Sequence, residues 1–237
     1  MTTITNRWQR VLNQVTDSAG RCGRAPSDVT LMAVSKTFPL SAVSEAYAAG
    51  ARHFGENYVQ EGVAKVQQCP HSDIVWHFIG PVQSNKTRPI AEHFNWVHTI
   101  DRLKVARRLS AQRPAGAPPL NLCLQINISA DSNKAGVAPA DAAPLAAEIA
   151  SLPHVVVRGL MTIPAQDLPP EILTEQFQAM RRLLDDLATH WPSMDTLSMG
   201  MSDDMMPAIA AGSTCVRVGR GIFGHRPAKP NHALNNQ

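Results

Sequence analysis

Residues 29–50 read VTLMAVSKTFPLSAVSEAYAAG and contain one complete strand–loop–helix unit. Val29–Ser35 is a short apolar run, which is typical of a strand buried on both faces of a parallel sheet. Ser41–Ala49 predicts a helix, and Gly50 ends it. The loop between the two carries a lysine, Lys36, and contains no glycine. Whether this unit repeats along the chain decides the fold.

The unit does repeat, at intervals of about 25 to 30 residues, which is the size of one βα unit. The further strands that we expect are Arg52–Gly55, Ile74–Ile79, Trp96–Ile100, Leu120–Ile128, Val155–Met161, Thr196–Met199 and Cys215–Gly219. Helical segments follow nearly all of them. Eight strands in 237 residues predict an α/β fold, a single (β/α)8 TIM barrel, and Thr3–Ala19 adds an extra N-terminal helix.

An open, doubly wound sheet is the alternative architecture. It usually needs fewer strands and a glycine-rich first turn, whereas the first turn here is Ser35–Pro39 without a glycine. We therefore favour the barrel. We expect one domain over residues 1–226, followed by a loose, polar tail at 227–237.

Composition limits the classes of function. The chain is 44% apolar and 17% charged, which is enough apolar matter for a large core, and a net charge of +3 is too small to predict nucleic-acid binding. Pro114–Ala130, the longest uncharged stretch, contains three prolines and cannot span a membrane. The N-terminal segment lacks the basic stretch and apolar run of a signal peptide, so we expect none, and the four cysteines form no CxxC pair. We expect a cytoplasmic protein with reduced thiols, without a metal, that binds neither nucleic acid nor membranes.

The loops after the seventh and eighth predicted strands contain an anion-binding pattern. In a barrel these loops lie at the mouth, where phosphate is commonly bound. Ser202 offers a hydroxyl just ahead of a helix, and Gly219 and Gly221 let the backbone approach an anion closely. The plainer interpretation is that Ser202 is an ordinary N-cap and that the glycines are turn residues.

Lys36 follows the first buried strand and is expected at the same mouth. A semi-buried position lowers the pKa of a lysine and exposes a nucleophilic amine that can form a Schiff base. Opposite a phosphate site, such an amine suits an aldehyde that carries a phosphate, and pyridoxal 5′-phosphate (PLP) is such a compound. The alternative is a lysine that extends to solvent.

Arg217 lies two residues before Gly219, so the strand period places both on the same side. A guanidinium only donates hydrogen bonds. Beside the pyridine nitrogen of PLP it would keep that nitrogen unprotonated, whereas an aspartate would keep it protonated and make the ring a strong electron sink. An ordinary salt-bridged arginine is the alternative.

Five separated motifs connect these residues to a known family. In chain order they are AVSKT at 33–37, FGENYVQE at 54–61, WHFIG at 76–80 with QSNK at 83–86, LSMGMSDD at 197–204 and VRVG at 216–219. They resemble motifs of the pyridoxal phosphate homeostasis protein family, and the match runs from about residue 4 to residue 226. The resemblance implies a single barrel like the N-terminal domain of alanine racemase.

The resemblance also implies roles for particular residues. Lys36 carries PLP as an internal aldimine, Ser202, Gly219 and Gly221 contact the phosphate, and Arg217 lies near the ring nitrogen. The remaining residues that the resemblance implies to line the cofactor pocket are Asn57, His77, Asn127, Met161 and Ser198.

The family is regarded as non-catalytic, and the resemblance implies a protein of vitamin B6, PLP and amino-acid homeostasis without substrate turnover. Its expected partners are PLP and, transiently, PLP-dependent apoenzymes, and we expect a monomer with Glu61 and Lys65 on a solvated helix face. Two other functions stay open. One is a PLP-dependent amino-acid racemase or lyase in which Lys36 and His77 transfer protons. The other is an aldolase that uses a lysine Schiff base without PLP.

Overall fold

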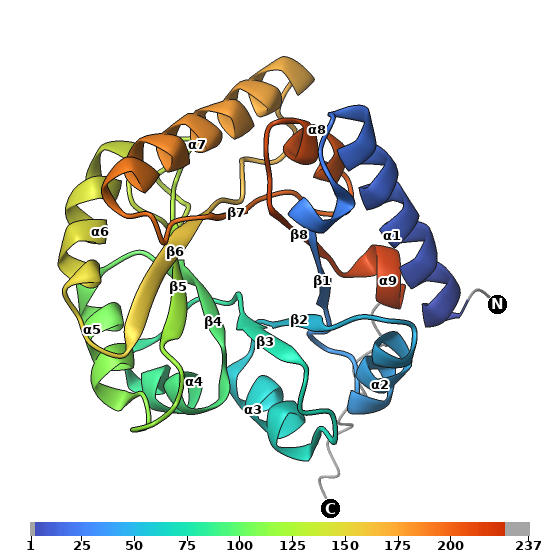
Figure 1. Ribbon diagram of the computed structural model, residues 1–237, viewed down its shortest axis with the longest axis horizontal. Helices are drawn as coiled ribbons and strands as arrows, with labels where there is room; N and C mark the ends of the chain where they lie inside the picture. Colours follow the sequence, from blue (N-terminus) through green and yellow to red (C-terminus); the bar gives the residue numbers. More distant parts are fainter. Residues whose placement is uncertain (1–2, 226–237) are drawn as a thin grey trace, which may run out of the picture.

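Eight parallel strands pair in chain order and close into a barrel, because β8 pairs with β1 (Figure 1). The computed structural model describes residues 3–225. The strands are β1 (Thr30–Val34), β2 (His53–Glu56), β3 (Val75–Phe78), β4 (Trp96–Ile100), β5 (Leu120–Gln125), β6 (Val155–Met161), β7 (Thr196–Ser198) and β8 (Cys215–Val218). The predicted (β/α)8 barrel is therefore confirmed, and the doubly wound sheet is excluded.

Helices form a ring around the barrel (Figure 1). They are α1 (Ile4–Arg21), α2 (Leu40–Ala48), α3 (Val59–Gln68), α4 (Thr87–His93), α5 (Leu103–Gln112), α6 (Ala142–Ala150), α7 (Pro170–His190), α8 (Met205–Ala210) and α9 (Arg220–Phe223). Their buried apolar side chains pack on those of the strands in one continuous core. None of the helices within residues 3–225 is both long and apolar enough to cross a membrane.

The N-terminal helix is part of this ring. Within residues 3–225, the strand β8 is followed only by the four-residue α9, and α1 contacts α2, α8 and α9. Figure 1 shows α1 between α8 and α2, where the eighth helix of a barrel belongs. Its apolar side buries Trp8, Val11 and Val15, and the Arg7 Nε–H donates to the carbonyl of Ile222 at 2.7 Å. The helix that the sequence predicts as an addition therefore completes the barrel.

A bulge in β6 sets the geometry at the amino ends of the strands. Leu122 pairs with Val157 and Cys123 with Gly159, so Arg158 is an extra residue in β6. Gly159 has φ 155°, and a Cβ at this position would lie 1.7 Å from the carbonyl oxygen of Thr196 on β7. Only glycine allows β6 and β7 to lie this close.

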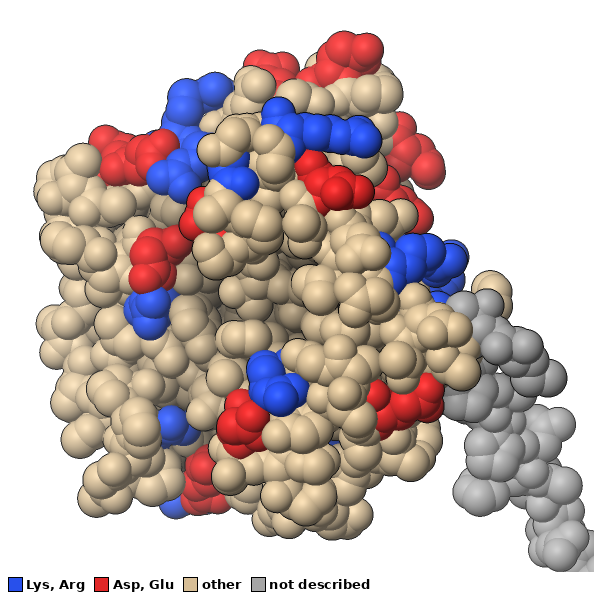
Figure 2. Space-filling model, turned by 45° about the vertical axis from the view of Figure 1, so that its right-hand side comes forward, with Lys and Arg blue, Asp and Glu red and all other residues tan. Residues whose placement is uncertain are grey.

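Several predicted boundaries differ from the structure, and local contacts explain two of them. The strand β5 ends at Gln125 rather than 128, because the loop that follows folds back and the N–H of Val137 donates to the Gln125 carbonyl. The turn itself lies at residues 128–129. The helix α8 begins at Met205 rather than at 203, because Asp204 folds the preceding loop by accepting the N–H of Met201. The predicted loose tail at 227–237 lies outside the described residues. On the face in Figure 2, acidic and basic side chains are interspersed over the described part of the chain.

Candidate functional site

A pocket of about 690 Å³ opens at the carboxyl ends of the strands, and we call it the mouth pocket. Six of the predicted site residues line it: Lys36, Asn57, Met161, Ser202, Arg217 and Gly219. They come from the ends of β1, β2, β6, β7 and β8, as expected for a barrel site. Apolar side chains, among them Val34, Ile79 and Ile163, form much of the remaining wall.

The loop that carries Lys36 is held in a strained conformation. Thr37, the next residue, has φ 70°, a left-handed conformation that non-glycine residues adopt rarely. The N–H of Thr37 donates to Glu61 Oε1 at 2.6 Å. This bond from α3 stabilises the strained turn and so fixes the position from which the Lys36 side chain leaves the backbone.

A buried ion cluster lies behind this loop. Lys65 Nζ donates to Glu56 Oε1 at 2.8 Å, to Glu61 Oε1 at 2.7 Å and to the carbonyl of Ser35 at 2.8 Å. The Ser35 hydroxyl donates to the same Glu56 oxygen at 2.5 Å. Burial raises the pKa of Glu56 above its usual range, and Lys65 and Ser35 oppose the shift. The cluster therefore fixes the backbone on both sides of Lys36.

The predicted solvated position of Lys65 is wrong, because Lys65 is buried. The i, i+4 spacing of Glu61 and Lys65, with Glu56 at the end of the preceding strand, is the signal that could have shown the cluster.

Arg217 is buried beneath the mouth pocket, and neutral acceptors hold its guanidinium. Its Nη1 donates to the carbonyl and to Oγ of Ser198 at 2.7 and 2.9 Å, and its Nη2 donates to the carbonyl of Thr162 at 2.9 Å. Burial lowers its pKa. Among residues 3–225 no carboxylate forms an ion pair with Arg217, so the salt-bridge alternative does not hold there.

The anion-binding pattern comes together between β7 and α9. Gly219 is the N-cap of α9, whose first N–H groups have no partner within the helix. A Cβ at Gly221 would lie 2.9 Å from the Val218 side chain and 3.7 Å from Ser202 Oγ, so the serine hydroxyl lies beside this glycine. Ser202 is not the N-cap of α8, because Asp204 has that position.

Four predicted site residues do not line the mouth pocket. Asn127 folds the loop after β5, where its amide donates to the carbonyl of Asp131 at 2.8 Å. Gly221 packs α9 onto β8, and Ser198 lies beneath Arg217. His77 lies in the barrel interior and faces the opposite end of the barrel.

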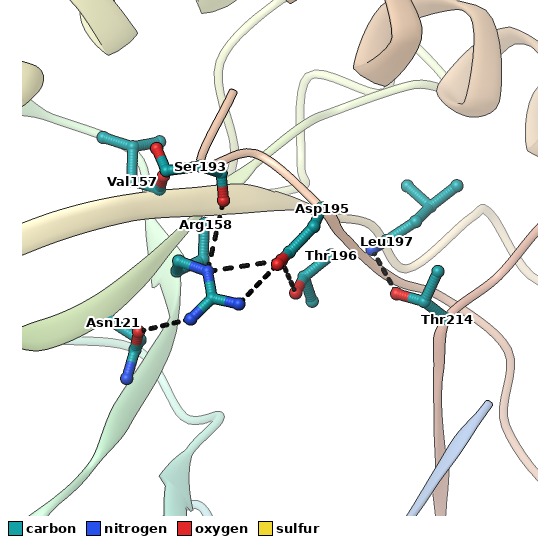
Figure 3. Close-up of polar contacts among 8 residues, drawn as sticks. All are labelled: Asn121, Val157, Arg158, Ser193, Asp195, Thr196, Leu197 and Thr214. Carbon is teal, nitrogen blue, oxygen red and sulfur yellow. Dashed lines mark hydrogen bonds and ion pairs between the residues drawn. The ribbon is translucent and has the colours of Figure 1, made fainter. Parts of the chain in front are cut away.

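A second pocket, of about 400 Å³, lies at that opposite end, and we call it the floor pocket. Its lining includes His53, His77, His98, Trp96, Arg158 and Asp195. Figure 3 shows Arg158 of the β6 bulge bound to Asp195 and to Asn121, and its guanidinium lies 5.1 Å from the ring centre of Trp96. His53 and His98 were not predicted as site residues. Histidines at inward positions of β2, β3 and β4 are the pattern that could have indicated them.

The chain matches a known class of barrels. Residues 18–227 match the family model of the alanine racemase N-terminal domain, so the chain belongs to this class of barrels. Within it, the chain is a member of the pyridoxal phosphate homeostasis protein family. It is 52% identical over 232 residues to the pyridoxal phosphate homeostasis protein of Escherichia coli K12, covering 95% of this chain and 98% of the relative.

Other relatives support the same membership. The pyridoxal phosphate homeostasis protein of Pseudomonas aeruginosa PAO1 is 51% identical over 226 residues, covering 95% of this chain and 97% of the relative. The structure of PipY from Synechococcus elongatus PCC7942, solved with PLP bound, has a TM-score of 0.75 and 38% identity. The match covers 89% of this chain and 100% of PipY.

Proposed function

We propose that this chain binds PLP in the mouth pocket and holds it as a Schiff base on Lys36. It stores or delivers the cofactor in the cytoplasm and turns over no substrate. The observation that carries the proposal is the meeting of Lys36, Arg217 and Ser202 in one pocket. Relatives of similar length that are named for pyridoxal phosphate homeostasis support it.

The groups of the mouth pocket fit the chemistry of PLP. Lys36 offers a primary amine for the aldehyde, Arg217 a permanent donor for the ring nitrogen, and Ser202 a hydroxyl for the phosphate. Asn57 Oδ1 is buried and has no hydrogen-bond partner among the described residues, so it is available to a ligand. Bound PLP supplies an aldehyde that condenses with an amine, forming a C=N bond and releasing one water, and a ring that withdraws electrons.

Two features of the protein argue against turnover. Arg217 only donates hydrogen bonds, so it favours an unprotonated ring nitrogen, which is a weaker electron sink. His77, the second acid–base candidate of the racemase alternative, faces the floor pocket rather than the mouth pocket. The mouth pocket therefore contains Lys36, the proposed Schiff-base amine, but not His77, the proposed second base for racemisation.

Reduction with borohydride tests the Schiff base. We expect the purified protein with PLP to show the yellow absorbance of a PLP Schiff base, and peptide mapping after reduction to find the pyridoxyl group on Lys36. Lys36→Ala abolishes the absorbance and retains weak PLP binding through the phosphate contacts. A pyridoxyl group on Lys86 or Lys134, with Lys36 unmodified, would overturn the assignment. No Schiff-base absorbance at all would remove PLP from the proposal.

Hydrogen exchange at the α-carbon separates homeostasis from catalysis. The protein with PLP is incubated with single amino acids in deuterated water, and loss of the α-proton is followed by NMR. We expect exchange at the background rate of free PLP. Exchange at about 1 s⁻¹ or faster with one amino acid, which is an ordinary enzyme turnover, would favour the racemase or lyase alternative.

The proposal includes transfer to apoenzymes by a monomer. Met201 and Ile163 line the mouth pocket and are 40% and 41% exposed, so the rim offers apolar surface for transient contact. Light scattering tests the monomer. The rate at which an apoenzyme regains activity tests the transfer. The holoprotein is compared with free PLP, whose concentration is set to the amount that the holoprotein releases in equilibrium dialysis.

A further inference from the structure

Three histidines connect the floor pocket to Arg217 through the barrel interior. His53 Nδ1 lies 3.0 Å from His77 Nε2, and His77 Nδ1 lies 2.9 Å from His98 Nε2. His98 Nδ1 lies 2.9 Å from Ser198 Oγ, which accepts from Arg217 Nη1 at 2.9 Å. We call His53, His77 and His98 the histidine file. In the file, polar side chains occupy positions in the barrel interior that branched apolar side chains usually fill.

Neutral imidazoles require the hydrogen bonds of the file to run in one direction. Burial lowers the pKa of each imidazole, well below 6.5 for His77 and to about 3 for His98, where the charge of Arg217 adds to the effect. The three rings are therefore neutral at physiological pH. A neutral imidazole has one donor and one acceptor nitrogen, so the tautomer of one ring determines the tautomer of the next.

Arg217 favours one of the two directions, and an acceptor at the floor end supports the same one. A guanidinium only donates, so Ser198 Oγ is the acceptor of that bond and its own proton goes elsewhere. The acceptor nitrogen of His98 is a better partner for this proton than the thiol of Cys215, which also contacts Ser198. This arrangement points the negative end of each imidazole dipole toward the buried cation. The proton of each ring is then on Nε2.

We propose that His53, His77 and His98 are positioning residues of the cofactor site, which act through Ser198 to orient and stabilise the Arg217 guanidinium. The file supplies the ordered dipoles that a buried cation needs when it has no carboxylate partner, as for Arg217 among residues 3–225. The inference rests on the proposed function, because PLP is the ligand whose ring nitrogen Arg217 meets. The hydrogen-bond direction itself is a property of the protein without PLP.

The direction of the file is measured first, in the protein without PLP. NMR of ¹⁵N-labelled histidine side chains distinguishes Nδ1–H from Nε2–H tautomers and both from the charged ring. We expect Nε2–H for all three residues at pH 7.5. A charged ring or an Nδ1–H tautomer at His77 or His98 would overturn the proposal, whatever the affinity for PLP.

Two variants at the floor end separate hydrogen bonding from packing. His53→Asn keeps a carbonyl oxygen that can accept from His77 Nε2–H, whereas His53→Phe fills the space and removes the acceptor. We expect His53→Asn to keep the tautomers of His77 and His98, and His53→Phe to shift both toward Nδ1–H. If the two variants give the same tautomers, the file does not transmit direction and the proposal is wrong.

The effect on the site is measured by PLP titration. We expect His98→Phe to weaken PLP binding about tenfold, the scale of one hydrogen bond to a charged group, and to shift the absorbance of bound PLP. His190→Phe on the surface of α7 is the control and binds PLP as the wild type does. Unchanged affinity and absorbance in a folded His98→Phe protein would overturn the positioning role. If wild type itself binds no PLP, the proposed function fails, while the tautomer measurement still decides the direction of the file.

Discussion

Lys65 does not line the mouth pocket, yet its ammonium group holds the loop that carries Lys36. Lys65→Met leaves the buried carboxylate of Glu56 and the half-buried carboxylate of Glu61 without their cation. We expect the free energy of unfolding to fall by about 3 kcal/mol, because an uncompensated buried charge is costly. Urea denaturation at pH 7.5 measures the change.

Arg181→Met is the matched control for Lys65→Met. Arg181 also forms an i, i+4 ion pair, with Asp185, but both side chains are more than a third exposed. Solvent screens that pair, so we expect a loss of about 1 kcal/mol or less. Equal losses in the two variants would contradict the role assigned to the buried cluster.

Ser202 allows phosphate binding and helix capping to be told apart. We expect Ser202→Ala to weaken PLP binding about tenfold, the scale of a hydrogen bond to a charged group. The melting temperature should not change, because Asp204 rather than Ser202 is the N-cap of α8. PLP titration and thermal unfolding of the same sample measure the two effects. Unchanged affinity would remove Ser202 from the proposed phosphate site.

The sequence predicted site residues best where the position of a residue along its strand determines its surroundings. Lys36 and Arg217 reach the mouth pocket because each lies at or just beyond the end of a strand. His77 was expected there too, but it is an inward residue nearer the floor, and depth within a barrel cannot be derived from period two alone. The buried partners of Lys65 depend on how α3 packs on β2, which periodicity does not specify.

Gly159 determines how closely the strands β6 and β7 approach each other, so a substitution there tests the packing of these two elements. Gly159→Ala places a methyl group against the Thr196 carbonyl and requires φ near 155°, which only glycine adopts readily. We expect a loss of more than about 3 kcal/mol in the free energy of unfolding, or failure to accumulate as soluble protein. Urea denaturation and soluble yield measure this.

The control for Gly159 is another glycine with positive φ. Gly116 has φ 81°, and a Cβ there would meet nothing within 4 Å. Gly116→Ala should therefore lose only about 1 kcal/mol, the backbone contribution alone. If both variants lose the same amount, the contact between β6 and β7 does not matter for stability.

The elements themselves were largely predictable, since apolar runs and helical periodicity mark them. The errors lie where local contacts move a boundary. The N–H of Val137 ends β5 early, and Asp204 delays the start of α8. The place of α1 was not predictable in this way. Its amphipathic pattern shows that one face is buried. That α1 takes the place of the eighth helix in the ring follows only from the short length of α9 in the structure.

The stability of the whole molecule should depend on pH through the histidine file. Each of the three histidines has a folded-state pKa below its unfolded value of about 6.5, so the unfolded chain binds more protons. Stability is therefore full above about pH 6.5 and falls below it, by about 1.4 kcal/mol per pH unit for each ring that stays neutral. Urea denaturation from pH 7.5 to pH 5 measures the slope.

A variant isolates the contribution of the file to this slope. Burial raises the pKa of Glu56, so this residue changes stability with pH in the opposite direction to the histidines. The slope of the wild type therefore combines both effects, and the comparison with His98→Phe separates them. We expect the slope of His98→Phe to be smaller by about one proton, and that of His190→Phe to equal the wild type. An unchanged slope in His98→Phe would mean that His98 is not the neutral, buried group that the structure shows.

The pairing of β1 with β8 has a consequence for synthesis on the ribosome. The strand β1 leaves the exit tunnel early, but one of its two neighbours is encoded some 185 residues later, counted from Thr30 to Cys215. Until then the nascent chain has an open strand edge, and α1 lacks its contacts with α8 and α9, which are not yet synthesised. The barrel therefore closes last along the boundary between β1 and β8. Chaperones that protect open edges have their longest opportunity to act at this boundary, and any pause in translation before β8 extends the time for which the edge is exposed.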